Sequence, residues 1–551
     1  MGRPWLSQYP PEVPPTLAYP DQPLDRFLSE AAARFPEQPA LIFYGRRFSY
    51  RQVDAAANRF AALLANFGIR PGERVALLLP NCPQSVIAYY GALRAGAVIV
   101  QLSPMAAPRE IILQLEDSGA RTLVTIDLLL ARALPAFEHG ACQRLLVGRL
   151  ADALPAHLRL LFPLKARREG QDLRIPERSG VFRWSDRADA PANPPQVTVR
   201  PDDLALIQYT GGTTGAPKGA MLTHRNLVAN ALQTAAWFPG VQPGRERILC
   251  VVPFFHVYGM TVCMNFGIHL AATLILLPRF DVPAVLAAIA RHRPTLFPGV
   301  PTMYVALLNH PQMQRYDLRS ITACISGAAP LPREVQERFE AITGGRLVEG
   351  YGLTEASPVT HANPLFGEGK PGSIGLPLPD TDCRIVDLED GRELPAGQVG
   401  ELLVRGPQVM KGYWNRPAET EQVLRDGWLR TGDVARMDED GYFYIVDRIK
   451  DMIISGGLNV YPREVEEVLY RHPAVREAAV IGVPDAYLGE AVQAYVVLTE
   501  GASVDAEELR RYCREHLAAY KVPKTIEFRD ELPKSLIGKV LRRALREETR
   551  A

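Results

Sequence analysis

Residues 208–219 read Gln208-Tyr209-Thr210-Gly211-Gly212-Thr213-Thr214-Gly215-Ala216-Pro217-Lys218-Gly219. The apolar run before them, residues 203–207, predicts a buried strand, and Thr223 after them is a suitable capping residue for a helix. The glycines let the backbone turn its amides inward, the threonines add hydroxyl donors, and Lys218 adds a positive charge. A donor-rich loop between a strand and a helix is suited to a polyphosphate.

The P-loop of nucleoside triphosphatases does not match this stretch. That motif places Ser or Thr directly after Gly-Lys, so that the hydroxyl reaches magnesium. Here Ala216 and Pro217 separate Gly215 from Lys218, and Gly219 follows the lysine. A glycine-rich turn that binds nothing is the simpler alternative, but the length and composition of the stretch favour a phosphate-binding loop.

The composition is that of a globular protein and gives no sign of nucleic-acid binding. Of 551 residues, 47% are hydrophobic and 22% are charged, and 62 Lys and Arg against 61 Asp and Glu give a net charge of +1. A chain of this length is expected to form more than one domain. Seven scattered cysteines without a Cys-x-x-Cys pair predict a reducing, cytoplasmic compartment, without structural zinc or disulfides.

No export or membrane-spanning segment is predicted. Prolines interrupt the N-terminus, which has no apolar core, and residues 1–23 contain seven of them. We therefore expect an extended arm that lies on the protein surface or on a partner. The longest apolar stretch, residues 260–277, carries Asn265 and His269 and predicts a helix that runs into a strand.

Strand and helix patterns alternate through much of the chain, which predicts an α/β fold with parallel sheets covered by helices. A helix is predicted at residues 84–94 between the first two strands. The predicted strands cover residues 75–79, 97–100, 122–126, 248–252, 273–277 and 322–326.

Residues 158–168 interleave leucines with basic residues. The simpler interpretation is a surface helix with a solvated basic face. The alternative is a contact with a membrane surface, because apolar and basic side chains follow one another closely.

Past residue 373 the pattern changes twice. Short strands with turns at 389–391 and 395–397 predict a small β-rich subdomain. A compact α+β unit of about a hundred residues is predicted after residue 447. Its predicted elements are a helix that begins at Pro462, strands near 477–482 and 491–498, and a helix near 505–518.

Two further stretches carry groups that a nucleotide site needs. Residues 349–355, Glu349-Gly350-Tyr351-Gly352-Leu353-Thr354-Glu355, offer an aromatic face, glycines for close approach, a hydroxyl, and a carboxylate for a hard cation. Residues 430–433 end in Asp433, whose carboxylate suits two ribose hydroxyls. Taken singly, each stretch is explained as well by a structural turn.

Together these stretches resemble the adenylate-forming superfamily of acyl-CoA synthetases, luciferases and peptide-synthetase adenylation domains, over roughly residues 25–545. Within it, the chain is most similar to bacterial long-chain fatty acid–CoA ligases. Five motifs occur in the family's order, at residues 208–219, 253–259, 351–355, 447–451 and 532–539.

The resemblance implies an ATP-dependent ligase that joins a long-chain fatty acid to CoA through an acyl-adenylate, with Mg²⁺ and release of AMP and pyrophosphate. It implies an N-terminal adenylation domain with a β-rich subdomain, followed by a small mobile α+β domain. Partners expected besides the substrates are a homodimer and the inner membrane face. The implied boundaries are 1–24 for the arm, 25–446 for the N-terminal domain, about 373–446 for the β-rich subdomain, 447–451 for the hinge and 452–551 for the C-terminal domain.

The resemblance also implies a role for each site residue. Contacts to the ATP phosphates are implied for Thr210, Gly211, Gly212, Thr213, Thr214, Gly215 and Lys218. The adenine is framed by Gly327, Ala328, Ala329, Glu349, Gly350, Tyr351 and Gly352. The remaining roles are the α-phosphate for Thr354, Mg²⁺ for Glu355, the ribose for Asp433 and Arg448, the hinge for Lys450, the pantetheine channel for Ser455, Gly456, Gly457 and Gly327, the acyl and thiol approach for Phe255 and His256, and a bridge between carboxylate and α-phosphate for Lys539.

Charge repulsion is the main obstacle to this chemistry, since a carboxylate must attack an anionic phosphate. A lysine and a magnesium ion address that obstacle directly. One such charge at 4 Å in a medium of effective dielectric near 20 is worth about 4 kcal/mol, or roughly a thousandfold in rate. The competing interpretations are a solvated lysine in a basic tail for Lys539, and a satisfied core histidine for His256.

Other functions remain open at the level of sequence. An adenylating enzyme that loads a free-standing carrier protein, a ligase for medium-chain or aromatic acids, and a luciferase share the motifs. The alternative without catalysis is a degenerate homologue that binds acyl ligands, but such a protein has no use for Glu355, Asp433, Arg448 and Lys539 together.

Overall fold

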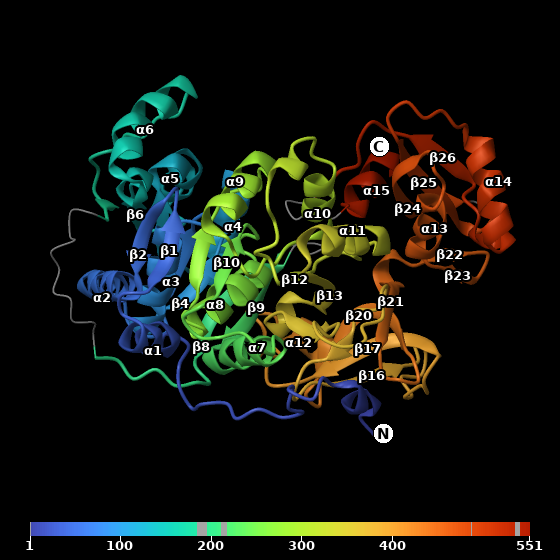
Figure 1. Ribbon diagram of the computed structural model, residues 1–551, viewed down its shortest axis with the longest axis horizontal. Helices are drawn as coiled ribbons and strands as arrows, with labels where there is room; N and C mark the ends of the chain where they lie inside the picture. Colours follow the sequence, from blue (N-terminus) through green and yellow to red (C-terminus); the bar gives the residue numbers. More distant parts are fainter. Residues whose placement is uncertain (1, 185–195, 211–216, 486, 535–539, 551) are drawn as a thin grey trace. The chain divides into compact units, whose positions relative to one another are not determined.

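The computed structural model describes residues 2–184, 196–210, 217–485, 487–534 and 540–550 (Figure 1). They form two compact units. The larger unit comprises Tyr9–Thr381 and Arg405–Gly427, and the smaller unit comprises Met1–Gln8, Asp382–Val404 and Trp428–Ala551.

The largest sheet of the larger unit has eight strands, in the order β18, β9, β8, β4, β3, β5, β6, β7. From β8 to β7 all neighbours are parallel, which confirms the predicted parallel sheet. The bounds are β3 Arg74–Leu78, β4 Val98–Gln101, β5 Thr122–Ile126, β6 Arg144–Gly148, β7 Val181–Arg183, β8 Leu204–Thr210, β9 Lys218–Thr223 and β18 Gly412–Tyr413.

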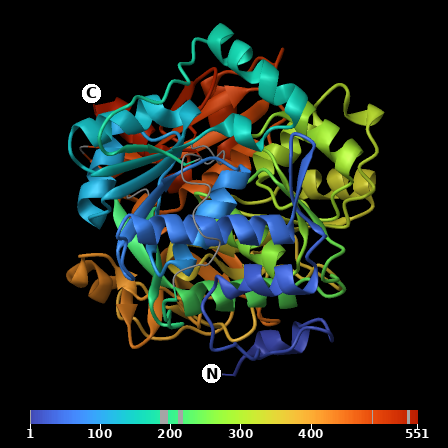
Figure 2. The ribbon, with the colours of Figure 1, turned by 90° about the vertical axis from the view of Figure 1, so that its left-hand side faces the viewer.

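Helices pack on this sheet and on one another through small and apolar residues. Ile111 and Leu115 of α4 and Ala133 of α5 join the buried strand side chains in one core. Helices α2 and α3 approach closely at Gly91, where a Cβ atom would lie 2.8 Å from the carbonyl oxygen of Ala57. Figure 2 shows the two blue helices α1 and α2 side by side. The bounds are α1 Arg26–Arg34, α2 Tyr50–Asn66, α3 Pro83–Arg94, α4 Pro108–Ser118 and α5 Leu130–Glu138.

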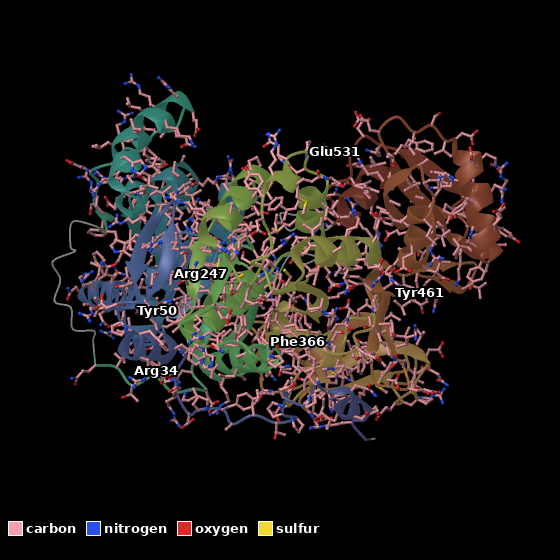
Figure 3. All side chains as sticks on the ribbon, in the orientation of Figure 1. Arg34, Tyr50, Arg247, Phe366, Tyr461 and Glu531 are labelled. Atoms are coloured by element: carbon pink, nitrogen blue, oxygen red, sulfur yellow. The ribbon has the colours of Figure 1, made fainter. Side chains whose placement is uncertain are left out.

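Two four-stranded sheets complete the larger unit, in the orders β10, β11, β1, β2 and β12, β13, β14, β15. Leu296 forms parallel bridges to Ile248 and to Ala323, so it joins the two sheets. Tyr50, labelled in Figure 3, opens α2 and donates its hydroxyl to the Ala272 carbonyl at 2.6 Å. The strands are β1 Pro39–Phe43, β2 Arg46–Ser49, β10 Arg247–Cys250, β11 Thr273–Leu276, β12 Ala323–Ser326, β13 Arg346–Gly352, β14 Val359–Ala362 and β15 Leu376–Pro377.

The apolar stretch 260–277 is a helix that runs into a strand, as predicted. A π-helical segment, η5 (Gly259–Asn265), continues into α8 (Phe266–His269) and then into β11. Among the described residues, no helix is both long and apolar enough to cross a membrane. Further helices of this unit are α7 His224–Ala236, α9 Val282–His292, α10 Pro301–Leu308, α11 Arg333–Thr343 and α12 Pro417–Val423. A short strand, β19, covers Leu424–Arg425.

The predicted helix capped by Thr223 is confirmed, but the prediction missed a strand between the glycine-rich loop and this helix. Strand β9 comes between them and pairs antiparallel with β8, so the loop joins two strands. The helix α7 begins at His224, and Thr223 caps it by accepting a hydrogen bond from the Asn226 amide. The apolar residues 220–222 are the sequence feature that favours a strand here. The strand β9 is too short for an alternating pattern of apolar and polar residues to be recognised.

Residues 158–168 lie in a surface helix, α6 (Ala156–Arg168), as the simpler interpretation predicted. Ala166 is its only buried residue. Leu160, Leu161 and Leu164 are 79%, 59% and 62% exposed. These exposed leucines share the helix with Lys165, Arg167 and Arg168.

The N-terminal arm contacts the chain itself. Trp5, in a 3₁₀ turn at Pro4–Gln8, is 4% exposed and packs edge-on against Phe443 in the smaller unit. In the larger unit, the Tyr19 hydroxyl donates to Asp380 Oδ2 at 2.7 Å. Aromatic side chains and prolines therefore fix much of the arm without sheet or α-helix.

The smaller unit contains two sheets. Strands β16, β17, β20 and β21 form the first, and β23, β22, β25 and β24 form the second, with β26 beside β25. Helices α13 and α14 enclose an apolar core against β24 and β25, and the predicted helices and strands after Pro462 are confirmed. The bounds are β16 Asp382–Val386, β17 Val399–Arg405, β20 Trp428–Met437, β21 Phe443–Arg448, β22 Ile453–Ser455, β23 Leu458–Val460, α13 Pro462–Tyr470, β24 Val475–Asp485, β25 Gly489–Leu498, α14 Ala506–His516, β26 Thr525–Phe528 and α15 Arg542–Arg550.

Candidate functional site

The two ends of the glycine-rich loop lie opposite each other in the larger unit. Thr210 ends β8, Lys218 begins β9, and the two residues pair in the antiparallel ladder. The Thr210 hydroxyl donates to the Lys218 carbonyl oxygen at 3.3 Å. Residues Gly211, Gly212, Thr213, Thr214 and Gly215 lie outside the described residues, so their assignment to the phosphates stays a prediction.

The two stretches assigned to adenine come together at the ends of neighbouring strands. Strands β12 and β13 are parallel, with Ser326 opposite Glu349. Gly327, Ala328 and Ala329 therefore follow one strand at the edge where Glu349, Gly350, Tyr351 and Gly352 end the other. The Leu331 amide donates to Glu349 Oε2 at 3.0 Å, and Glu349 is buried.

Backbone strain marks the same edge. Ala328 has φ +68°, a left-handed conformation that costs an ordinary residue about 1 to 2 kcal/mol. Such strain persists where the surrounding structure fixes the chain, and it is common at ligand sites. Tyr351 packs edge-on against His361 at 5.8 Å between ring centroids, and burial lowers the pKa of His361 to about 3. His361 is therefore neutral at physiological pH.

Glu355 and Lys218 approach the same tyrosine, which the sequence analysis missed. Glu355 lies with Thr354 in a 3₁₀ turn, η7 (Thr354–Ala356). The Tyr413 hydroxyl donates to Glu355 Oε1 at 2.7 Å, and Lys218 Nζ lies 5.3 Å from the centroid of the Tyr413 ring. The only sequence signal was an aromatic pair, Tyr413-Trp414, after a glycine.

The segment assigned to the acyl and thiol approach adjoins both the loop strand and the adenine edge. Gln208 Nε2 donates to the Phe255 carbonyl oxygen at 3.0 Å. The Tyr258 ring lies 3.4 Å from where a Cβ atom would stand on Gly327. Phe255 and His256 are half-buried.

His256 is less enclosed than a core histidine. Its Nδ1 accepts the Tyr258 amide at 3.2 Å, so the neutral ring carries its proton on Nε2. Met260 and Met264 are buried in the π-helical segment η5.

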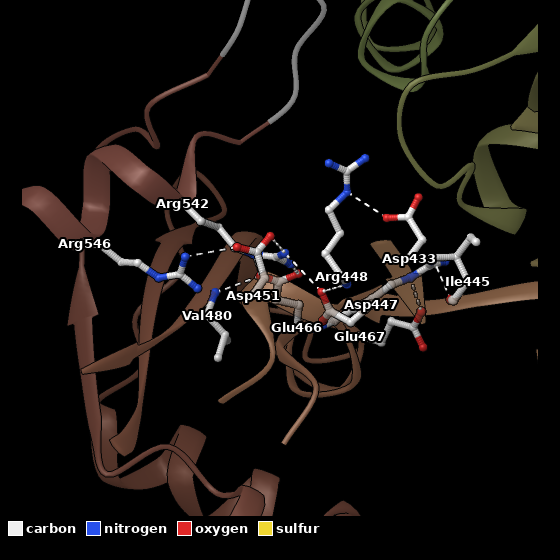
Figure 4. A network of polar contacts seen from close by, with 11 residues as sticks. Asp433, Ile445, Asp447, Arg448, Asp451, Glu466, Glu467, Val480, Arg542 and Arg546 are labelled. Carbon is white, nitrogen blue, oxygen red and sulfur yellow. Dashed lines mark hydrogen bonds and ion pairs between the residues drawn. The ribbon is translucent and has the colours of Figure 1, made fainter. Parts of the chain in front are cut away.

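Asp433 and Arg448, both assigned to the ribose, meet in the smaller unit. They pair across β20 and β21, and Arg448 Nε lies 2.8 Å from Asp433 Oδ1 (Figure 4). The Asp433 side chain is 3% exposed and that of Arg448 is 36% exposed. One carboxylate and one guanidinium are thus held side by side, with the arginine reaching solvent.

A buried ionic network adjoins this pair. Arg542 of α15 contacts Asp447 at 3.4 Å, Asp451 at 3.3 Å and Glu466 at 2.6 Å (Figure 4). Arg546 adds a contact to Asp451 at 3.1 Å. Burial raises the pKa of both Asp447 and Glu466, and the arginine partly offsets this. Burial disfavours the charge of Arg542, but Glu466 and Asp447 raise its pKa overall.

A solvated basic tail, the competing interpretation for Lys539, does not describe two basic residues that flank it in sequence. Arg542 is enclosed by carboxylates, and Lys534 pairs with Glu477 at 2.7 Å. Lys450 lies in the 3₁₀ turn η8 (Ile449–Asp451), next to the network residue Asp451. Lys539 lies outside the described residues, so its role stays a prediction.

Ser455, Gly456 and Gly457 form the turn between β22 and β23. Ser455 is buried, and the glycines are exposed. Their φ angles of +59° and +80° favour glycine. The Gly456 amide donates to the Leu488 carbonyl oxygen at 2.8 Å. Their assignment to a pantetheine channel stays a prediction.

The residues present fit a magnesium ion that binds together with a nucleotide. Among the described residues, no three His, Cys, Asp or Glu side chains gather into a site made of protein ligands alone. Mg²⁺ in nucleotide enzymes is usually held by one or two carboxylates plus phosphate oxygens. Glu355 supplies such a carboxylate, near the lysine that begins β9.

Comparisons with known proteins extend over almost the whole chain. The profile of the AMP-binding enzyme family matches residues 28–414, and that of the AMP-binding enzyme C-terminal domain matches residues 464–539. A long-chain-fatty-acid–CoA ligase of Bacillus subtilis is 50% identical, over 99% of this chain and 98% of its own. The enzyme of the same name from Escherichia coli is 41% identical, over 100% and 99%.

A solved structure has the same fold. The crystal structure of an anthranilate CoA ligase in complex with anthranoyl-AMP superposes with a TM-score of 0.85 and 28% identity. The superposition covers 97% of this chain and 98% of that one.

Proposed function

Because the chain belongs to the AMP-binding enzyme family, we propose that it is an ATP-dependent long-chain fatty acid–CoA ligase that works through an acyl-adenylate. The 50% identity to a ligase of that name, over 99% of this chain, carries the proposal. The adenine edge, the loop ends and Glu355 within the larger unit support it.

In the first half-reaction, a fatty acid carboxylate attacks the α-phosphate and pyrophosphate leaves. Lys218 and the loop amides bind the phosphates, and Thr354 donates to the α-phosphate. Glu355 holds Mg²⁺, which when bound supplies positive charge to the phosphate oxygens. Lys539 neutralises the approach of the two anions.

In the second half-reaction, the CoA thiol attacks the acyl-adenylate carbonyl and AMP leaves. We assign the pantetheine channel to Ser455, Gly456 and Gly457, and the wall of the thiol approach to Phe255 and His256. Asp433 and Arg448 bind the ribose in this proposal, and Lys450 is the hinge about which the C-terminal domain, residues 452–551, rotates between the half-reactions.

Pyrophosphate release tests the proposal. The purified protein is incubated with ATP and MgCl₂ and a panel of acids from acetate to oleate, with one aromatic acid included. We expect release that is highest with long-chain acids. Release with none of the acids would contradict the proposal, and a maximum with the aromatic acid would favour the activity named for the anthranilate CoA ligase.

The acceptor requires a separate measurement. The acyl-adenylate formed in the first step is offered either CoA or a holo-carrier protein. We expect thioester formation with CoA. Preferential transfer to the carrier would instead favour the carrier-loading alternative.

We also propose that α6 contacts an anionic membrane surface, because three exposed leucines share it with basic residues. Leu160, Leu164 and Arg168 follow at four-residue spacing, so they lie along one face. Arg167 and Arg168 form no ion pair within the described part of the chain. A long-chain acid partitions into lipid, so such a contact brings the enzyme to its substrate.

Flotation with phosphatidylglycerol vesicles tests this contact. Each basic residue near an anionic surface contributes about 1 kcal/mol, so Arg167→Glu with Arg168→Glu is expected to weaken binding roughly thirtyfold or more. Leu160→Ser with Leu164→Ser is expected to weaken binding to the same vesicles as well. Unchanged flotation of both variants would rule the contact out.

A homodimer is the further partner that we propose, and light scattering of the purified protein distinguishes one chain from two.

A further inference from the structure

We propose that Tyr413 is a positioning residue that orients the Glu355 carboxylate for the Mg²⁺ of bound ATP and keeps Lys218 apart from that carboxylate. This inference rests on the proposed function. Lys218, Glu355 and Tyr413 all lie in the larger unit.

The backbone of Tyr413 is fixed on both sides. It lies in β18, which pairs with β9, so that Tyr413 stands opposite Ala220. Its amide donates to Thr420 Oγ1 at 2.8 Å, and the following Trp414 amide donates to the Gly219 carbonyl oxygen at 2.7 Å. Tyr413 is 8% exposed. Its ring therefore keeps one position relative to the strand that Lys218 begins.

The hydroxyl fixes one oxygen of Glu355 without neutralising the carboxylate. It donates to Oε1 at 2.7 Å, and the Met410 amide donates to the Glu355 carbonyl oxygen at 2.8 Å. Within the described residues, Oε2 accepts no hydrogen bond. A phenol is an uncharged donor near neutral pH, so this hydrogen bond adds no positive charge beside the carboxylate. An oriented carboxylate with its full charge is what a hard cation requires.

The ring of the same tyrosine holds Lys218. The ammonium nitrogen lies 5.3 Å from the ring centroid, within the range of a cation–π attraction. In the described part of the chain, no ion pair joins Lys218 to Glu355. A direct pair would cancel the two charges that the phosphates and the metal need. Tyr413 contacts both groups and thereby keeps both charges available to the ligand.

Tyr413→Phe removes the hydroxyl and retains the ring. ATP binding is measured by isothermal titration calorimetry, once across an MgCl₂ series and once in EDTA. Loss of a group that orients a metal ligand typically costs 10- to 100-fold in metal affinity, so we expect the Mg²⁺ concentration for half-maximal enhancement of ATP binding to rise about tenfold. ATP affinity in EDTA is expected to stay within about twofold of wild type, because the Lys218 contact is retained.

Two variants separate positioning from packing. Tyr413→Leu also removes the ring, so ATP affinity in EDTA is expected to fall about two- to fivefold. Tyr19→Phe is the matched control, because it deletes another phenol–carboxylate bond, to Asp380, and is expected to leave both binding measurements unchanged.

A double mutant completes the test. If Tyr413 acts through Glu355, then Tyr413→Phe added to Glu355→Gln should not change Mg²⁺ dependence further. An Mg²⁺ requirement of Tyr413→Phe within about twofold of wild type overturns the proposal, as does an equal loss of ATP affinity with and without Mg²⁺. These are binding measurements, whereas the proposed function fails only if no acid releases pyrophosphate from ATP.

Discussion

Two groups of carboxylates in this protein have opposite kinds of partner. Glu355 in the larger unit accepts a hydrogen bond from a neutral phenol. Asp447, Asp451 and Glu466 in the smaller unit surround the guanidinium of Arg542. The phenol orients the Glu355 carboxylate and leaves its negative charge in place. The guanidinium instead neutralises carboxylates whose burial without a cation would cost free energy. The first arrangement suits ligand binding, and the second holds helix α15 against strand β21 and turn η8.

The same contrast separates two basic residues close together in the sequence. Lys539 is assigned to the reacting groups, and Arg542, three residues later, belongs to the buried network. Changes at the first kind of site should therefore lower rate, and changes at the second kind should lower stability.

Replacement of Lys539 is expected to have the largest effect. Lys539→Ala should lower acyl-adenylate formation by roughly a thousandfold or more, because one charge near the reacting anions is worth about 4 kcal/mol. Thioester formation from a supplied acyl-adenylate should be largely spared. The two half-reactions are measured separately by pyrophosphate release and by CoA thioester yield. Equal loss in both would contradict the assignment of Lys539 to the first half-reaction.

Replacement of Glu355 should lower rate and leave stability intact. Glu355→Gln keeps an acceptor for the Tyr413 hydroxyl but removes the charge, so we expect adenylate formation to fall roughly a hundredfold to a thousandfold. The free energy of unfolding should change by less than about 0.5 kcal/mol, as for other partly exposed substitutions. A large loss of stability with unchanged pyrophosphate release would reverse the interpretation of this site.

Replacement of Arg542 should show the opposite pattern. Arg542→Met leaves Asp447 and Glu466 without their cation, whereas Asp451 keeps Arg546. Breaking a buried ionic network in this way costs about 3 to 5 kcal/mol. Differential scanning calorimetry is expected to show a lower midpoint temperature of unfolding than for wild type. Arg543→Met is the matched control, because Arg543 pairs with Glu547 on the exposed side of the same helix, where such pairs contribute about 0.5 kcal/mol or less. Equal effects of the two substitutions would show that burial of Arg542 does not matter.

A buried histidine extends the comparison to a group that the fold needs in its neutral form. Burial lowers the pKa of His224 from 6.5 to about 4, and its Nδ1 accepts the Leu24 amide at 3.1 Å. As the pH falls, this histidine takes up a proton in the unfolded chain at a higher pH than in the folded chain. The free energy of unfolding therefore falls between pH 6.5 and pH 4, by about 3 kcal/mol in all.

His224→Gln tests this pH dependence. The variant is expected to lose less stability than wild type over that window, since one proton-binding group of the unfolded chain is gone. Chemical unfolding midpoints at pH 7, 6, 5 and 4.5 give the comparison. His157→Gln on the exposed helix α6 is the control. If the unfolding midpoint of the His224 variant depends on pH as steeply as that of wild type, other groups cause the acid sensitivity.

Sequence patterns predicted most elements but missed connections set by pairing. The apolar runs at 75–79 and 122–126 coincide with β3 and β5, and the helix at Pro462 begins where it was predicted. Strand β9 was missed because residues 218–223 have no periodicity of their own and are strands only through pairing with β8. The surface helix α6 was predicted, whereas the burial of Trp5 depends on its contact with Phe443.

The sequence by itself determined the family, the α/β architecture and the chemical type of most site residues. Local composition carries that information, since a loop rich in glycine and threonine, a Tyr-Gly-Leu-Thr-Glu stretch and a lysine near the C-terminus each reflect a local requirement. Only the tertiary structure decided that Tyr413 lies against Glu355 and Lys218, and that Arg542 is buried among Asp447, Asp451 and Glu466. Those contacts join segments far apart in the chain. The packing of strands and helices decides which partner a charged or aromatic side chain meets, and the neighbours of that side chain in sequence do not encode this packing.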